Sequence, residues 1–169
     1  LALVGRLEEA TGQVAAGVQR AKRERDATML DVWARIDGMV HLAAGRLSAA
    51  RAAVESLPPP DHADPTEFDV VRMAVLIEVA ARTDDRNLLQ QNLAHVHDAY
   101  SNGSSMARRT AAYALALAAW YRHDLHNAQR WLGGDIHLFG TPVLPHSLDQ
   151  VILAARVAAV AGDAGGRAG

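Results

Sequence analysis

The hexapeptide Gly45-Arg46-Leu47-Ser48-Ala49-Ala50 decides the fold, because its pattern occurs twice in the chain. The other copy is Gly5-Arg6-Leu7-Glu8-Glu9-Ala10, and the step from residue 5 to residue 45 is 40 residues. Continuing the spacing leads to Asp84, His123 and Gly162, in three further steps of 39 residues. At each of these five markers one helical pattern breaks and another begins. A period of about 20 to 50 residues is the signature of a repeat architecture.

The segments between the markers have the periodicity and boundary signals of helices. We expect first helices, which precede a marker, over residues 29–44, 66–83, 105–122 and 147–161. We expect second helices, which follow a marker, over residues 7–25, 47–57, 86–100 and 125–132. Residues 58–65 and 133–146 hold the proline and glycine runs that end helices, so we expect loops there. The sequence therefore predicts an all-α chain of antiparallel helix pairs with a period of about 39 residues.

The composition agrees with closely packed helices. Half of the 169 residues are hydrophobic, yet Phe, Trp and Tyr together make up only 5%. Small side chains must therefore fill much of the interior, which favours packed helices over a sheet. Positions at a fixed distance from the markers hold mostly small residues, as in Ala10, Ala50, Leu89 and Ala128, and in Gly38, Ile77, Ala116 and Ala155. We expect helices to cross at these positions.

The pattern resembles a tetratricopeptide repeat, which has small residues on both helices and Gly-x-x-x-x-Ala across the turn. The tetratricopeptide period is about 34 residues, so the period here is longer. From Gly5 to Ala164 the chain is similar to the repeat region of the large ATP-binding, LuxR-type transcription regulators of bacteria, the MalT-like STAND class. That resemblance implies a right-handed superhelix lying between a nucleotide-binding switch region and a helix-turn-helix.

The phase of the repeats predicts that residues 1–169 are a single helical-repeat domain, cut within a repeat at both ends. Residues 1–4 look like the tail of a first helix, and Gly162-Asp163 opens a second helix. No Gly-x-x-x-x-Gly-Lys-Ser/Thr phosphate loop occurs in this segment, because Lys22 is its only lysine. We therefore expect other domains of the same chain to be among its partners.

Charge and cysteine content exclude several classes of protein. Lys and Arg (17) nearly balance Asp and Glu (19), and a net charge of −2 disfavours direct nucleic-acid contact. The basic cluster of Arg20, Lys22, Arg23 and Arg25 is interpreted as a solvated helix C-terminus, with a nucleic-acid contact as the weaker alternative. The chain has no cysteine, which fits a cytoplasmic protein. Its longest apolar run, residues 111–121, is shorter than the ~20 residues of a membrane span.

Two histidine pairs and two carboxylate pairs are the candidates for chemistry: His95 with His97, His123 with His126, Glu8 with Glu9, and Asp84 with Asp85. The first histidine pair is two residues apart on a helix and so faces different ways. The second pair has a metal-like spacing but no evident third ligand. The carboxylates lie at helix starts, where the helix dipole favours them. We therefore expect a non-enzymatic segment with no catalytic residue, metal or cofactor.

The concave side of a helical-repeat protein is its usual binding surface, and first helices line it. If the tetratricopeptide analogy holds, the polar and aromatic groove residues are Arg35, Glu78, Arg82, Tyr113, Trp120, Tyr121, Asp149 and Arg156. Aromatic rings beside charges suit a sugar-like effector or a peptide. The alternative is that Trp120 and Tyr121 fill gaps in an alanine-rich core.

These observations predict a sensor or interaction segment of a signal-responsive bacterial transcription regulator. Its partner in the groove is expected to be a small-molecule effector or a protein or peptide. A generic tetratricopeptide-like scaffold for a protein partner is the alternative, and an all-α enzyme is a third possibility without support from clustered titratable groups.

Overall fold

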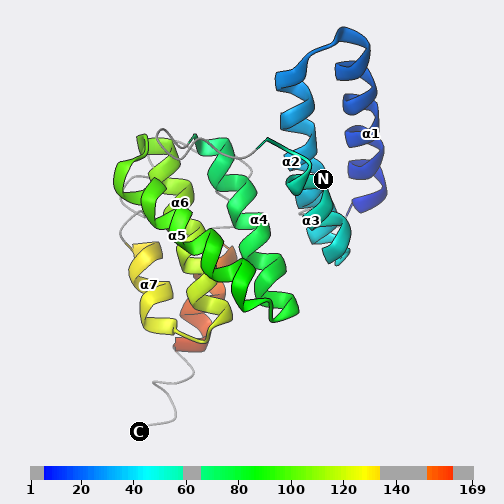
Figure 1. The fold of residues 1–169 in the computed structure, drawn as a ribbon. Helices are drawn as coiled ribbons and strands as arrows, with labels where there is room; N and C mark the ends of the chain where they lie inside the picture. Colours follow the sequence, from blue (N-terminus) through cyan, green and yellow to red (C-terminus); the bar gives the residue numbers. More distant parts are fainter. Residues whose placement is uncertain (1–5, 59–65, 134–151, 162–169) are drawn as a thin grey trace, which may run out of the picture. The chain divides into compact units, whose positions relative to one another are not determined.

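The computed structural model describes residues 6–58, 66–133 and 152–161, and throughout these ranges the regular structure is α-helix, with no strand (Figure 1). The all-α prediction is therefore confirmed, whereas the right-handed superhelix stays a prediction. No helix in the described ranges combines the length and hydropathy that crossing a membrane requires. The chain divides into two compact units, residues 1–61 and 62–169, which are described separately below.

The first unit contains three helices, with α2 packed against both of its neighbours. They are α1 (Leu7–Glu24), α2 (Ala27–Ala43) and α3 (Leu47–Glu55). The α1–α2 interface is built around the buried residues Ala10, Val14 and Val40, against which Val18, Trp33 and Ile36 pack. Ala10, Val14 and Val18 of α1 thus face Trp33, Ile36 and Val40 of α2.

Gly17 sets the distance between α1 and α2. The residue is buried, and the Trp33 indole lies where a side chain at position 17 would begin. Because a Cβ there would overlap three atoms of the ring, the indole can pack directly on the α1 backbone only when residue 17 is glycine. Gly12, one and a half turns earlier on the same helix, is exposed and has open space around its position.

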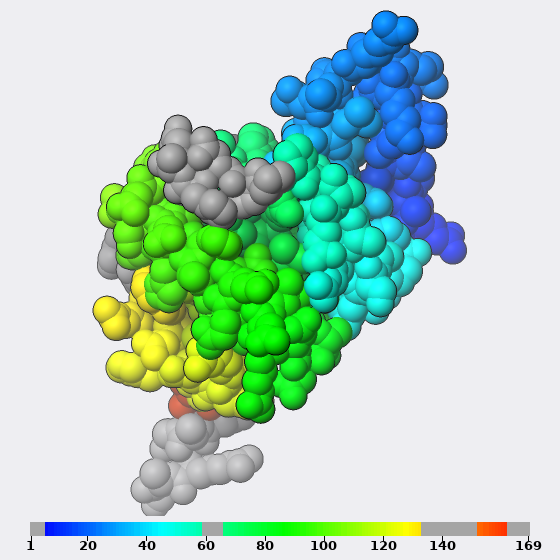
Figure 2. All heavy atoms as spheres, in the orientation of Figure 1, coloured from blue at the N-terminus to red at the C-terminus, as the bar shows by residue number. Residues whose placement is uncertain are grey.

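The second unit contains α4 (Glu67–Thr83), α5 (Arg86–Asn102), α6 (Ser105–Tyr121), α7 (Leu125–Gly133) and a helix at residues 152–161. Helix α6 packs against α4, α5 and α7, and α4 also packs against α5. The first helices α4 and α6 therefore contact their own second helices, α5 and α7, and α6 also contacts both helices of the preceding pair. On the face drawn in Figure 2, the atoms of α5, α6 and α7 form a continuous surface.

Helix α6 contributes to two cores at once. One core joins it to α4 and α5 through buried residues that include Ile77, Val96, Ala111, Ala114 and Ala118. The other core joins it to α7 and the helix at residues 152–161 through Ala116, Leu117, Ala119, Ala128, Leu132, Leu153 and Val157. Helix α6 is thus enclosed by apolar contacts on opposite sides.

Three of the five markers occupy the same kind of turn. Gly45, Asp84 and His123 have φ values of 74°, 54° and 59°, in the left-handed region. In each turn the next residue's N–H donates to the carbonyl five residues before it: Arg46 to His41, Asp85 to Ala80, and Asp124 to Ala119. This bond is typical of a Schellman helix ending. The turns expected at residues 45, 84 and 123 are therefore present, and the markers at residues 5 and 162 lie outside the described ranges.

Capping side chains mark the starts of α2 and α4. The Asp26 carboxylate accepts a hydrogen bond from the Met29 N–H at 3.0 Å, so α2 begins two residues before the predicted residue 29. Thr66 and Asp69 form a reciprocal capping box at the start of α4. Helix α5 was predicted to end at residue 100, and it continues two residues further. The sequence-based boundaries otherwise differ little from the observed ones.

The Gly17–Trp33 contact makes a prediction about stability. Gly17→Ala should lower the free energy of unfolding by roughly 1 to 3 kcal/mol, because overpacking outweighs the better helix propensity of alanine. Gly12→Ala on the same helix should instead raise it by about 0.5 to 1 kcal/mol. Urea unfolding followed by circular dichroism measures both, and equal effects of the two substitutions would contradict the contact.

Ala50, Ala116 and Ala128 are each 0% exposed, as expected for helix crossings. Ala116→Leu should therefore overpack the core shared by α6 and α7 and destabilise the protein by roughly 1 to 3 kcal/mol. Ala94→Leu, at an exposed position of α5, is the matched control and should change stability by less than about 0.5 kcal/mol. Melting temperatures of the two variants test the assignment, which fails if Ala116→Leu melts with the parent protein.

Candidate functional site

The strongest candidate site is a group of polar side chains on the first helices of the second unit. Its members are Glu78 and Arg82 on α4, Tyr121 on α6, and Arg156 on the helix at residues 152–161; we call them the first-helix cluster. The Tyr121 hydroxyl donates to Glu78 Oε1 at 3.0 Å and so joins residues 43 positions apart in the chain. This bond connects the end of α6 to the last turns of α4.

The same carboxylate also meets a guanidinium. Arg82 Nη1 lies 3.4 Å from Glu78 Oε1, in the i,i+4 arrangement that helix geometry allows. The side chain of Arg82 is 33% exposed and that of Glu78 is 21% exposed. A cation and a phenol therefore converge on one carboxylate that is still in contact with solvent.

Burial of Tyr121, followed by the charge of Glu78 and its hydrogen bond, raises the pKa of the Tyr121 phenol to about 12. The charges of Arg82 and Arg156 act in the opposite direction. The phenol therefore stays neutral at physiological pH and can keep donating to Glu78. Arg156, on the helix at residues 152–161, is linked to the cluster through this charge effect, whereas α4 and α6 are joined by direct contacts.

The structure places the other predicted groove residues in different ways. Tyr113 and Trp120 on α6 are partly buried and pack against the core that α6 shares with α7. They thus contribute to packing and also keep some exposed surface. Arg35 lies on α2 in the first unit, and Asp149 is outside the described residues. Direct contacts join three of the eight predicted side chains, Glu78, Arg82 and Tyr121, and Arg156 is linked to them only through the effect of its charge on Tyr121.

An aromatic cluster on the second helices was not predicted. The Trp131 ring on α7 makes edge-to-face contacts with Tyr100 and His97 on α5, with centroid distances of 5.0 and 5.9 Å. The guanidinium of Arg130 lies 5.7 Å from the Trp131 centroid. The i,i+3 spacing of His97 and Tyr100 shows that they share a helix face. Their partner, about 30 residues later in the sequence, follows only from how α5 and α7 are placed (Figure 1).

One member of each carboxylate pair, Glu9 and Asp85, makes a contact at a helix start, whereas Asp84 is the C-cap residue of α4. Asp85 accepts a hydrogen bond from the Leu88 N–H at 3.0 Å at the start of α5. Asp124 accepts bonds from the side-chain amide and the backbone N–H of Asn127, which lower the pKa of its carboxyl group. Glu9 pairs with Arg6 at the start of α1. These contacts agree with the helix-dipole interpretation.

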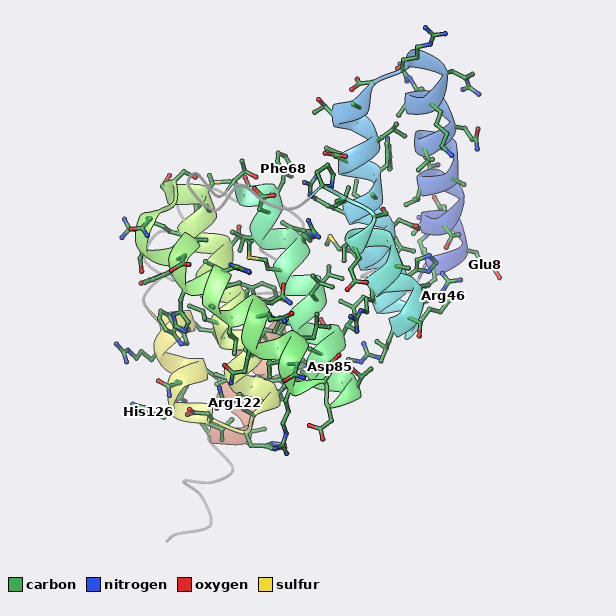
Figure 3. The ribbon with its side chains drawn as sticks, viewed as in Figure 1. Glu8, Arg46, Phe68, Asp85, Arg122 and His126 are labelled. Atoms are coloured by element: carbon green, nitrogen blue, oxygen red, sulfur yellow. The ribbon has the colours of Figure 1, made fainter. Side chains whose placement is uncertain are left out.

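The basic cluster and three of the four candidate histidines, His97, His123 and His126, are exposed, whereas His95 is partly buried. Figure 3 shows Asp85, Arg122 and His126 at the end of the second unit that holds the α4–α5 and α6–α7 turns. Within the described ranges, no three His, Cys, Asp or Glu side chains are arranged to hold a metal ion. Lys22 and Arg23 lie in the last turn of α1, where they complement the helix dipole.

Comparison of the chain with protein-family models, with curated proteins and with solved structures gave no match. The function is therefore argued from the first-helix cluster.

The Tyr121–Glu78 bond predicts a pH dependence at the alkaline end. The folded protein holds the Tyr121 proton up to a pKa of about 12, whereas the unfolded chain releases it near 10. The contribution of this bond to stability is therefore fully present below pH ~10 and is lost as the pH rises toward 12. Absorbance at 295 nm should show a late phenol ionisation that Tyr121→Phe removes and Tyr100→Phe keeps. A titration curve with the same late ionisation in Tyr121→Phe would contradict the assignment.

Proposed function

We propose that this chain is a non-catalytic interaction module that binds an effector or partner through the first-helix cluster of its second unit. The observation that carries the proposal is the Tyr121–Glu78 hydrogen bond, which fixes a charged and hydrogen-bonding group at a partly exposed position. Polar groups that are already ordered lose less conformational entropy when a ligand binds. The cluster therefore has the preorganisation that a binding site needs.

Packing alone does not require polar side chains at this place. Elsewhere on α6 the contacts with α4 and α5 are made by alanine and leucine, including Ala111, Ala114 and Leu115. Partly buried charged groups lose hydration and are costly unless they are paired. Glu78 is such a group, and its pairing with Arg82 of α4 and with the Tyr121 hydroxyl of α6 supports a role in recognition.

The neighbouring aromatic residues suggest what such a ligand looks like. Tyr113 and Trp120 are seven residues apart on α6, a spacing that puts two residues on one helix face. Partly exposed rings beside paired charges suit a molecule with both apolar and polar surfaces, such as a sugar or a peptide.

The resemblance of the repeat pattern extends this proposal to the whole protein. In the large LuxR-type regulators the repeat region lies between a nucleotide-binding switch and a DNA-binding domain. We place this module in such a signal-responsive regulator of the bacterial cytoplasm, where ligand binding would be passed to other domains of the same chain. The support for this step is the recurrence of Gly-Arg-Leu-x-x-Ala and the marker spacing.

Chemical-shift mapping on the 169-residue chain tests the binding role. Neutral sugars and short peptides are titrated into ¹⁵N-labelled protein, and we expect saturable shifts around Glu78, Tyr121 and Arg156. Tyr121→Phe should weaken binding about 2- to 10-fold, the value of one hydrogen bond, with little change in melting temperature.

Tyr100→Phe on α5 is the matched control and should bind like the parent protein. Saturable shifts confined to α5 and α7, or a panel without any binder at the first-helix cluster, would rule out the proposed role.

A further inference from the structure

The aromatic cluster of Trp131, Tyr100 and His97 is joined by two arginines. The Arg130 guanidinium lies over the Trp131 ring, 5.7 Å from its centroid. Arg108, in the first turn of α6, donates from Nε to the Tyr100 carbonyl at 2.8 Å. Since the Tyr100 and Trp131 centroids are 5.0 Å apart, both guanidinium groups are anchored on one aromatic pair. We call these five residues the basic aromatic cluster.

The rings of this cluster are held by the core, and its polar groups lie at the surface. Trp131 is partly buried and packs against both cores of α6, and Tyr100 packs against the core shared with α4 and α5. Arg108, Arg130 and His97 are exposed. Helices α5 and α7, which carry four of the five residues, both reach the surface drawn in Figure 2. Ring surface of fixed orientation therefore lies next to exposed positive charge.

The charge around the cluster is positive, although the whole chain carries a net charge of −2. Within α5, α6 and α7 the only acidic residue is Asp98. It lies two positions before Tyr100 on α5, and side chains at this spacing lie on different sides of a helix. Asp85 and Asp124 cap the starts of α5 and α7, whereas the cluster residues lie in the second halves of these helices. Charge complementarity therefore calls for an anionic partner.

We propose that the basic aromatic cluster is the docking surface for an acidic segment of a partner protein, whose carboxylates pair with Arg108 and Arg130 and whose apolar side chain packs on Tyr100 and Trp131. This surface shares no residue with the first-helix cluster and stands independently of the function proposed there. A guanidinium and a carboxylate can form two parallel hydrogen bonds, which give the pair both strength and orientation.

The exposure of the cluster favours a polypeptide over a small molecule. Small-molecule sites bury most of the ligand's surface, whereas three of the five side chains here are exposed. The contacts are also spread over α5, α6 and α7, so that an extended segment can reach both arginines.

The arrangement of the rings favours a peptide over a single-stranded nucleic acid. Nucleic-acid binders neutralise a run of phosphates and stack bases on aromatic faces. Here Arg130 already lies over the Trp131 ring, and Tyr100 and His97 meet that ring at steep interplanar angles of 80° and 64°. Side-chain packing at the edge of this group is compatible with that geometry, whereas stacking of successive bases is not.

The test compares two peptides that differ in charge and hardly in size. The blocked hexapeptide Ac-Ser-Glu-Leu-Phe-Glu-Ser-NH2 and its analogue with glutamine in place of both glutamates are titrated into the ¹⁵N-labelled chain at pH 7 and low salt. We expect the acidic peptide to bind about tenfold more tightly, with saturable shifts at Tyr100, Arg108 and Trp131. The difference should shrink at high salt, which screens exposed charges.

Arginine variants show whether the cluster is responsible. The double variant Arg108→Gln with Arg130→Gln should bring the ratio of the two Kd values close to one, and Arg130→Gln alone should lower it about threefold. Arg86→Gln removes the same charge from a side chain that is 87% exposed at the start of α5 and should keep the tenfold ratio. Melting temperatures show that the variants remain folded. A tenfold ratio that survives in the double variant contradicts the assignment.

The other outcomes overturn the proposal in identifiable ways. Equal Kd values, or no saturable binding of either peptide, would exclude an acidic segment as the partner. Tighter binding of an eight-nucleotide oligothymidine would assign the surface to nucleic acid, and shifts at the cluster on dilution of the chain alone would assign it to a second copy. Tyr121→Phe should leave peptide binding unchanged, so that a failure of this inference is separate from a failure of the proposed function.

Discussion

The small volume of alanine at the faces of α6 sets how closely its neighbours approach, and the second unit depends on that distance. Ala107, Ala111 and Ala114 are 0% exposed on the side of α4 and α5, and Ala116 is 0% exposed on the side of α7. Protein interiors are packed nearly as densely as organic crystals, so a side chain of this size fixes the gap between two helices. The narrow gap in turn brings the end of α6 within hydrogen-bonding reach of α4.

Tyr121 lies where this alanine-lined packing gives way to the surface. Its ring packs against the core shared by α6 and α7, and its hydroxyl reaches Glu78 on α4. One side chain therefore belongs both to the interior and to the candidate site. The packing of its ring agrees with the gap-filling interpretation of the α6 aromatic residues, whereas the groove-lining interpretation stays a prediction.

Local chemistry made the helix boundaries predictable. Thr66, Asp85 and Ser104 cap helices through bonds to residues three positions away, and such spacing is readable from sequence. The i,i+4 pairing of Glu78 with Arg82 could also be predicted from the spacing of the two residues in the sequence.

The bond from Tyr121 to Glu78 could not be predicted from the sequence, because its geometry depends on the offset between two packed helices. The contact of Trp131 with Tyr100 depends on a similar offset. Sequence periodicity identifies which residues share a face, but the offset of one helix along another follows from side-chain packing.

The pattern of helix contacts has a consequence for how the chain folds. The principal contacts join helices that are adjacent or separated by one helix in the chain, as in α1 with α2, α4 with α6, and α6 with α7. Contacts between elements close in sequence require only short loops to be closed and are associated with fast folding. During synthesis each helix can therefore find its main partners among the two that emerged just before it. Apolar surface would then be buried progressively as the helices form, and little of it would stay exposed until a distant segment of the chain is made.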